Sequence, residues 1–227
     1  MTAGVLRRAM ISLVVSFLIL AAVLFVPAGD VWWAKGWLFF FVFLVLTILA
    51  CVYLWRRNPA IFAARSKIQK GIKRWDKVLM FFLFLSLLAV CPVAGLDDGR
   101  FHWSSVPTWL VVLGYVLFSF GFVLSAWAEA VNKFAEPGVR IQTERGHKVV
   151  DTGPYAIVRH PKYLSAFFLF FGTALALGSF WALIPAVFVA LTIIVRTAFE
   201  DRTLQNELEG YKAYASRIRY RLIPGVW

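Results

Sequence analysis

Residues able to support chemistry gather first in the stretch 153–163. It contains a Gly-Pro turn, the basic side chains of Arg159 and His160, and Pro161 at the start of an apolar run. Proline suits the first turn of a helix because its φ is fixed and it carries no N–H group. The remaining N–H groups of that turn, beside two basic side chains, are typical of a site for a carboxylate or phosphate. We therefore expect this stretch to hold the acidic group of a small ligand at a membrane surface.

The same residues also have a purely structural interpretation. Arg159 and Lys162 would then only mark the cytoplasmic side of a membrane helix, and His160 would be an ordinary interfacial residue. A charged side chain beside lipid is costly, which favours a functional role. The spacing by itself leaves both interpretations open.

A second pair of candidates, Arg196 and Glu200, lies at the end of the last long apolar run. Residues four apart share one face of a helix, so the two could form an intrahelical ion pair. Arg196, however, directly follows apolar residues, where an unpartnered guanidinium beside lipid is costly. A guanidinium can also hold a carboxylate or phosphate through two parallel hydrogen bonds. We therefore consider Arg196 a candidate for binding an acidic ligand.

The composition places these candidates in an integral membrane protein. The chain is 61% hydrophobic and 16% charged, and its mean hydropathy is +0.74, which is outside the range of soluble domains. The net charge of +12 comes from basic residues in the loops between apolar runs, so we expect no nucleic-acid partner. Cys51 and Cys91 lie inside apolar runs without a CxxC spacing, so we expect no disulfide and no metal site.

Six apolar runs come close to the roughly 20 residues that cross a bilayer as a helix. We therefore predict an all-α membrane protein of about six transmembrane helices. The last two runs flank Gly178-Ser179 and should form a tight antiparallel hairpin. The predicted spans are Ala9–Val26, Trp32–Trp55, Val78–Gly95, Val106–Val131, Tyr163–Leu177 and Phe180–Phe199.

The distribution of basic residues predicts the orientation. The loop 56–77 contains eight Lys or Arg residues against Asp76 alone, whereas the loops at 28–31 and 96–105 are mainly acidic. Because basic loops stay in the cytoplasm, we predict that both termini and the site face the cytoplasm. The loop 56–77 could in addition be an amphipathic segment on the membrane surface. We divide the chain into a four-helix region, 1–131, and a region that holds the chemistry, 132–227.

From about Asn132 onward, the chain resembles the isoprenylcysteine carboxyl methyltransferase family, which is related to phospholipid N-methyltransferases. The resemblance depends on several short motifs in a fixed order, each of them weak alone. These motifs are His147–Val150, Gly153-Pro154-Tyr155, Arg159–Tyr163, Arg196 to Glu200, Tyr211 to Tyr214 and Ile223-Pro224-Gly225. Ser165 replaces a usual glycine, and Asp201 follows Glu200 where many members have a second Glu.

The resemblance implies a methyltransferase that uses S-adenosylmethionine and acts on a prenylcysteine-type carboxylate or a similar lipid within the membrane. It assigns catalytic roles to Arg196 and Glu200, with Arg196 also binding the polar group of the acceptor. If the acceptor is an amine, His147, His160 and Glu200 are candidate proton acceptors. The implied cofactor-binding residues are Gln142, His147, Lys148, Val149, Val150, Tyr155, His160, Pro161, Lys162, Tyr163 and Glu200.

Three other functions remain open from the sequence. A phospholipid N-methyltransferase would share the same motifs. A membrane reductase of the sterol-reductase type, using NADPH, has a related C-terminal hairpin. A non-catalytic membrane protein could keep the fold alone. Glycine-rich phosphate loops and the GxGxxG pattern do not occur in the sequence.

Overall fold

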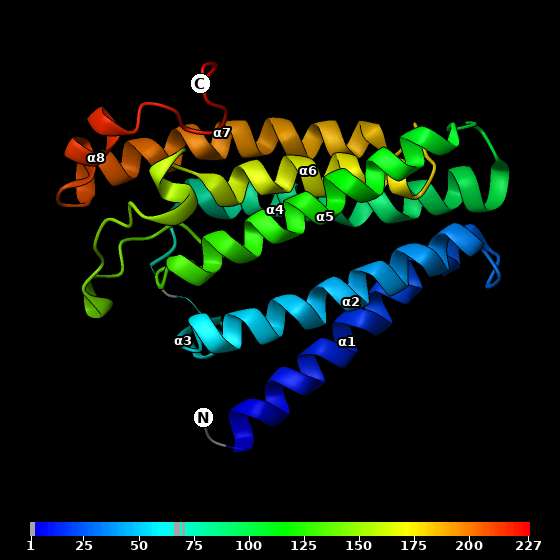
Figure 1. Cartoon of the computed structure of the whole chain (residues 1–227), viewed down its shortest axis with the longest axis horizontal. Helices are drawn as coiled ribbons and strands as arrows, with labels where there is room; N and C mark the ends of the chain where they lie inside the picture. The colour runs from blue at the N-terminus through cyan, green and yellow to red at the C-terminus, as the bar shows by residue number, and fades with distance from the viewer. Residues whose placement is uncertain (1–2, 66–68, 70) are drawn as a thin grey trace.

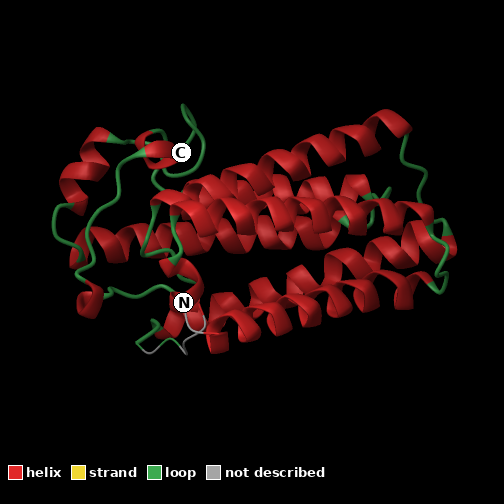
Figure 2. Cartoon of the chain, turned by 60° about the horizontal axis from the view of Figure 1, so that its bottom comes forward, coloured by secondary structure: helices red, strands yellow, loops and turns green. Residues whose placement is uncertain are grey.

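The computed structural model describes residues 3–65, 69 and 71–227, and all regular elements in these ranges are helical (Figures 1 and 2). This confirms the predicted all-α fold. A π-helical segment, Gly95–Phe101, continues α4, and two 3-10 turns lie at Thr143–Arg145 and Gly153–Ala156. The α-helices are α1 (Ala3–Ala28), α2 (Ala34–Arg57), α3 (Ala60–Arg65), α4 (Arg74–Ala94), α5 (Thr108–Val131), α6 (Pro161–Ala176), α7 (Leu183–Glu207) and α8 (Tyr211–Arg217).

Five helices in the described ranges are long and apolar enough to cross a membrane, and α6, with 16 residues, is shorter. The prediction of about six spans therefore corresponds to five long helices and one short one. Helix α6 begins at Pro161, as expected from the proline. It ends at Ala176, and the turn 177–182 then leads into α7.

The turn after α4 differs from the predicted loop at 96–105, because the helical path continues to Phe101. Two acidic side chains hold this segment in place. Asp97 is fully buried and accepts hydrogen bonds from the Ser104 backbone N–H at 2.8 Å and the Ser179 hydroxyl at 2.6 Å. Asp98 accepts from the Trp33 indole at 2.8 Å. The acidic residues thus serve as acceptors that join this turn to the starts of α2 and α7.

The apolar core lies in the half of the molecule next to that turn. Leu24, Phe39, Val90 and Phe118, from four different helices, are each at most 3% exposed and belong to one contiguous cluster. Most other large apolar side chains on these helices are exposed on the outer surface. This pattern fits helices whose outer faces contact membrane lipids.

Helices α5 and α6 approach each other more closely than side chains would allow. A Cβ atom added to Gly114 would lie 2.3 Å from the backbone N of Ala176, and one added to Gly172 would lie 2.5 Å from the backbone N of Phe118. Small residues at such contacts allow close packing between membrane helices. The glycines therefore set the distance between α5 and α6, and with it the position of the start of α6.

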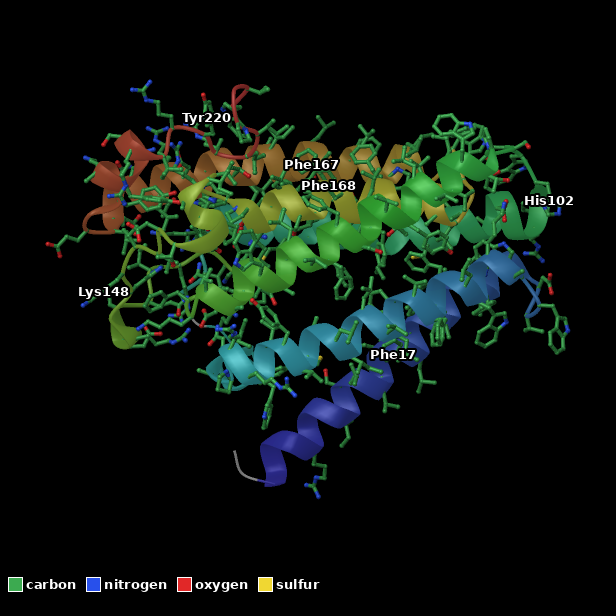
Figure 3. The ribbon with its side chains drawn as sticks, viewed as in Figure 1. Phe17, His102, Lys148, Phe167, Phe168 and Tyr220 are labelled. Carbon is green, nitrogen blue, oxygen red and sulfur yellow. The ribbon has the colours of Figure 1, made fainter. Side chains whose placement is uncertain are left out.

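The loop that follows α5, the start of α6, the end of α7 and α8 lie together at the end of the molecule opposite the Asp97 turn. Figure 3 shows Lys148 and Tyr220 at one end and His102 at the other. The N-terminus of α1 and the C-terminus also lie toward the Lys148 end (Figure 1). Of the predicted basic loop 56–77, Lys67 and Lys70 are outside the described residues, and α3 is the only helix described within it before α4 begins.

The close contact of α5 and α6 predicts a large effect of adding bulk there. Gly114→Val should lower the free energy of unfolding by about 1–3 kcal/mol or more, because the new side chain meets backbone atoms that cannot move aside. Thermal unfolding in detergent, followed by gel-filtration recovery, measures this. Val116→Leu, on the exposed face of the same helix, is the control and should leave the unfolding midpoint unchanged. Equal midpoints for the two variants would contradict the role of Gly114.

Candidate active site

A cavity of about 320 Å³ lies at the Lys148 end of the molecule, between the loop 132–150, α4, and the facing parts of α6 and α7. Every residue that the sequence analysis assigned to a site lines it, with the exception of Pro161. The predicted residues found in its wall are Gln142, His147, Lys148, Val149, Val150, Tyr155, His160, Lys162, Tyr163, Arg196 and Glu200.

One wall of the cavity is apolar, and the sequence analysis did not predict it. Helix α4 contributes Met80, Leu83, Phe84 and Leu87, whose spacing of three and four residues places them on one helical face. Phe84 lines the cavity and is also 60% exposed on the outside of the bundle. The cavity therefore extends from the polar loop to the surface of α4 that faces lipid. Only a structure could join these residues to a motif that begins some 60 positions later.

The polar wall is held by a buried carboxylate, Asp201, which is fully inaccessible to solvent. It accepts hydrogen bonds from Arg159 Nε at 2.8 Å and Nη2 at 3.0 Å, from Arg221 Nε at 2.9 Å, and from the Tyr211 hydroxyl at 3.1 Å. These partners come from the loop before α6, the C-terminal tail and α8. Asp201 thus connects three segments to α7. In the sequence, Asp201 stands out only as a departure from a family pattern.

The C-terminal tail completes the same wall through backbone hydrogen bonds. The N–H groups of Arg159 and His160 donate to the carbonyl oxygens of Tyr220 and Arg221, each at 2.9 Å. The Tyr163 N–H donates to the His160 carbonyl at 3.0 Å. Neither these N–H groups nor the Arg159 side chain is available to an acidic ligand. The protein itself therefore uses these groups of the anion site that was expected at the start of α6.

Arg196 and Glu200 both line the cavity, and among the described residues they do not form the intrahelical ion pair that the sequence allowed as an alternative. Arg196 instead binds Asp76 at the start of α4, with Nε 2.7 Å from Oδ1 and Nη2 3.1 Å from Oδ2. Glu200 accepts a short hydrogen bond from the Tyr163 hydroxyl. The guanidinium of Arg196 lies 5.3 Å from the centre of the Tyr163 ring, within the range of a cation–π contact.

Ion pairs neutralise several cations of the cavity wall. Arg196 is paired with Asp76, Lys162 with Glu129 at 3.0 Å, and Arg140 with Glu136 at 2.9 Å. Glu200 differs, because within the described ranges its carboxylate bonds a neutral hydroxyl and forms no ion pair. A cationic group entering the cavity would therefore find its best partner at Glu200.

His147 is held as a neutral hydrogen-bond donor. Its Nδ1 accepts the backbone N–H of Gln142 at 3.3 Å, so the proton of the neutral ring belongs on Nε2. Burial lowers the pKa of His147, and the guanidiniums of Arg140 and Arg145 lower it further. The imidazole is therefore neutral near pH 7, and it contacts the ring of Phe134 at a tilt of 38°, with 4.5 Å between centroids.

Tyrosine hydroxyls close the rest of the polar wall. Tyr214 donates to the carbonyl oxygen of Tyr155 at 2.7 Å, and Asn132 donates to the Tyr155 hydroxyl at 3.0 Å. Burial raises the pKa of Tyr155, Tyr211 and Tyr214 above the ordinary value, and the carboxylate of Asp201 raises that of Tyr211 further. These hydroxyls consequently stay protonated and do not act as bases near neutral pH, and those of Tyr211 and Tyr214 donate to protein acceptors.

Comparison with known families gives one match in the region of the cavity. Residues 109–209 match the model of the phospholipid methyltransferase family, which is related to the isoprenylcysteine carboxyl methyltransferases. The matched part is a little under half of the chain. It includes all of α5 but its first residue, the loop 132–160, α6 and α7, and so every predicted site residue. It excludes Asp76, the apolar wall on α4 and the C-terminal tail. A comparison with curated proteins gave no match.

The buried position of Asp201 predicts that its charge is essential for stability. Asp201→Asn should lower the free energy of unfolding by about 3–5 kcal/mol, because Arg159 and Arg221 would lose their shared carboxylate. Asp151→Asn is a matched control, since Asp151 pairs with Arg217 of α8 at an exposed position and should cost less than about 1 kcal/mol. Thermal unfolding in detergent compares the two. Similar midpoints would show that the buried network is not needed.

Proposed function

We propose that the protein is a methyltransferase that uses S-adenosylmethionine and acts on a membrane-embedded acceptor, a prenylcysteine-type carboxylate or a similar lipid. The observation that carries this proposal is the cavity itself. It unites the polar residues of the matched region with an apolar wall that reaches the lipid-facing surface of α4. A water-soluble cofactor and a lipid acceptor could therefore meet in one cavity.

The residues of the polar wall fit the chemistry of the cofactor. S-adenosylmethionine supplies an electrophilic methyl group on a sulfonium cation. Glu200 provides a carboxylate for a cationic group, and its hydrogen bond from Tyr163 fixes its orientation. His147 presents an Nε2–H donor, and Val149 and Val150 add apolar surface to the same wall. Holding the reactants in line and excluding water are the main tasks for such a site.

The acceptor would be held by two parts of the cavity. The stripe of Met80, Leu83 and Leu87 would contact its hydrocarbon chain, and Arg196 would bind its polar group. A carboxylate acceptor is already ionised at pH 7, so it needs no strong base. An amine acceptor would lose a proton to Glu200, because Nδ1 of His147 is occupied and His160 Nε2 lies 3.3 Å from Asp201.

The cavity would open to the cytoplasm on its polar side. The loop 132–150, α8 and the ends of α2 and α7 lie at this end of the molecule (Figure 1). Arg56, Arg57, Lys148 and Lys212 are exposed there. Basic segments next to membrane helices stay on the cytoplasmic side, which supports placing both termini and the site in the cytoplasm.

Titration of the purified protein with S-adenosylhomocysteine and with NADPH tests the proposed function. Saturable binding of S-adenosylhomocysteine, together with methyl transfer to a prenylcysteine or phospholipid probe, is expected. Binding of NADPH alone would replace the proposal with a reductase of the sterol-reductase type. Binding of neither would indicate a protein that has the fold without the activity.

Glu200 should contribute to cofactor binding through its charge. Glu200→Gln keeps the shape of the side chain but removes the negative charge, so the dissociation constant for S-adenosylhomocysteine should rise about tenfold or more, as expected for a lost charged contact. Isothermal titration calorimetry measures this constant. Glu209→Gln, an exposed position beyond the end of α7, is the control and should bind like the wild type. Unchanged affinity in Glu200→Gln would remove Glu200 from the cofactor site.

The apolar wall should contribute to acceptor binding and not to cofactor binding. Leu83→Ala removes part of the contact with a hydrocarbon chain, so KM for a lipid probe should rise by about three- to tenfold, with S-adenosylhomocysteine affinity unchanged. Leu85→Ala, on the exposed face of the same helix, should behave as the wild type. Steady-state kinetics in mixed micelles measures both. Equal KM values for the two variants would place the acceptor elsewhere.

A further inference from the structure

Asp76 and Arg196 form a buried pair that joins the start of α4 to α7 beside the cavity. Asp76 lies in the first turn of α4 and is fully buried, and Arg196 is 5% exposed. The carboxylate takes the side of the guanidinium that carries Nε and Nη2, at 2.7 and 3.1 Å. Nη2 also donates to the Pro137 carbonyl oxygen at 2.5 Å. This is the two-bond geometry in which arginine binds carboxylates most specifically.

The pairing leaves one end of Arg196 for a ligand. Nε and Nη2 are occupied, whereas Nη1 has no hydrogen-bond partner in the part of the chain that the structure describes. Arg196 lines the cavity. An acidic group in the cavity would therefore reach the Nη1 end of a guanidinium whose charge is already balanced, and not the side that binds a carboxylate through two bonds.

Asp76 is itself held firmly in place. The Val139 backbone N–H donates to Asp76 Oδ2 at 2.6 Å, and the Lys73 N–H donates to the Val139 carbonyl oxygen at 3.1 Å. The Asp76 N–H in turn donates to the Lys73 carbonyl oxygen at 3.1 Å. The start of α4 and the loop after α5 thus form one hydrogen-bonded unit, in which the position of the carboxylate is fixed.

We propose that Asp76 is a positioning residue that occupies the two-bond side of Arg196 and so restricts the acceptor carboxylate to its Nη1 end. This inference rests on the proposed function of the cavity. Without the negative charge of Asp76, the Nε and Nη2 side of Arg196 would lack a balancing carboxylate, and it would attract the acceptor carboxylate. The acceptor would then bind more tightly, but away from the position that transfer requires. Tight binding of a misplaced substrate lowers turnover without helping the reaction.

Asp76→Asn tests the proposal with two probes, N-acetyl-S-farnesylcysteine and its neutral methyl ester. Binding is measured in the presence of S-adenosylhomocysteine, so this part of the experiment does not depend on activity. We expect the acid to bind at least threefold more tightly to the variant than to the wild type, with the affinity for the ester within twofold. With S-adenosylmethionine, turnover of the acid should fall tenfold or more while its KM falls. A purely structural role would weaken the binding of both probes together.

Glu207→Gln is the matched control, because Lys73 and Glu207 also connect the start of α4 to α7, at 2.6 Å, but do not line the cavity. This variant should keep wild-type affinities and turnover. Asp76→Glu retains the charge and should restore the wild-type affinity for the acid. If Asp76→Asn does not fold, the double variant Asp76→Asn, Arg196→Gln removes both charges and should bind acid and ester equally.

Several results would overturn the proposal. One such result is an affinity of Asp76→Asn for the acid that is equal to or lower than that of the wild type. Another is a wild-type protein that binds the acid and the ester with equal affinity. A double variant that still prefers the acid would show that Arg196 does not contact it. Failure of the wild type to transfer a methyl group, with the expected binding pattern intact, would instead refute the proposed function and leave the role of Asp76 in ligand placement standing.

Discussion

The carboxylate of Asp201 is the interaction on which the polar half of the molecule depends. It is fully buried near the end of a membrane helix, and it binds Arg159 from the loop before α6, Arg221 from the tail and Tyr211 from α8. Tyr211 and Tyr214 of α8 also belong to a small apolar cluster with Leu208. The shared carboxylate adds charged hydrogen bonds that join these segments to α7. Removing one partner would leave buried charges without compensation, which is far more costly than losing an exposed ion pair.

A second constraint is the contrast between the two ends of the bundle. At the Asp97 turn, acidic side chains bind hydroxyl, indole and ammonium groups and close the structure tightly. At the other end, ion pairs surround a cavity in which Glu200 forms no ion pair with the described residues. Similar residue types thus close one end and surround a cavity at the other. The difference arises because the second end includes a long loop in place of a short turn.

Much of this architecture could be predicted from the sequence. The length of the apolar runs indicates the membrane helices, and Pro161 marks the start of α6. The motif order also identified the residues that meet in the cavity. The partners of the charged residues could not be predicted. Asp76 is 120 positions from Arg196, and no local pattern distinguishes it from an ordinary acid in a basic loop. Arg159 was expected to face a ligand. It instead binds Asp201, which follows in the sequence only after α6 and most of α7. Long-range ion pairs leave no periodic signal.

The pairing of Asp76 with Arg196 also has a consequence for the order in which the protein is assembled. An arginine within a membrane helix costs about 2.5–3.5 kcal/mol on insertion scales when it stands alone. Translation delivers α4 before α7, so the carboxylate is already at the membrane when the guanidinium arrives. Helix α4 would then supply the acidic partner for Arg196 of α7 while the protein inserts into the membrane. A chain that begins after α4 would present Arg196 to the bilayer with no acid to receive it.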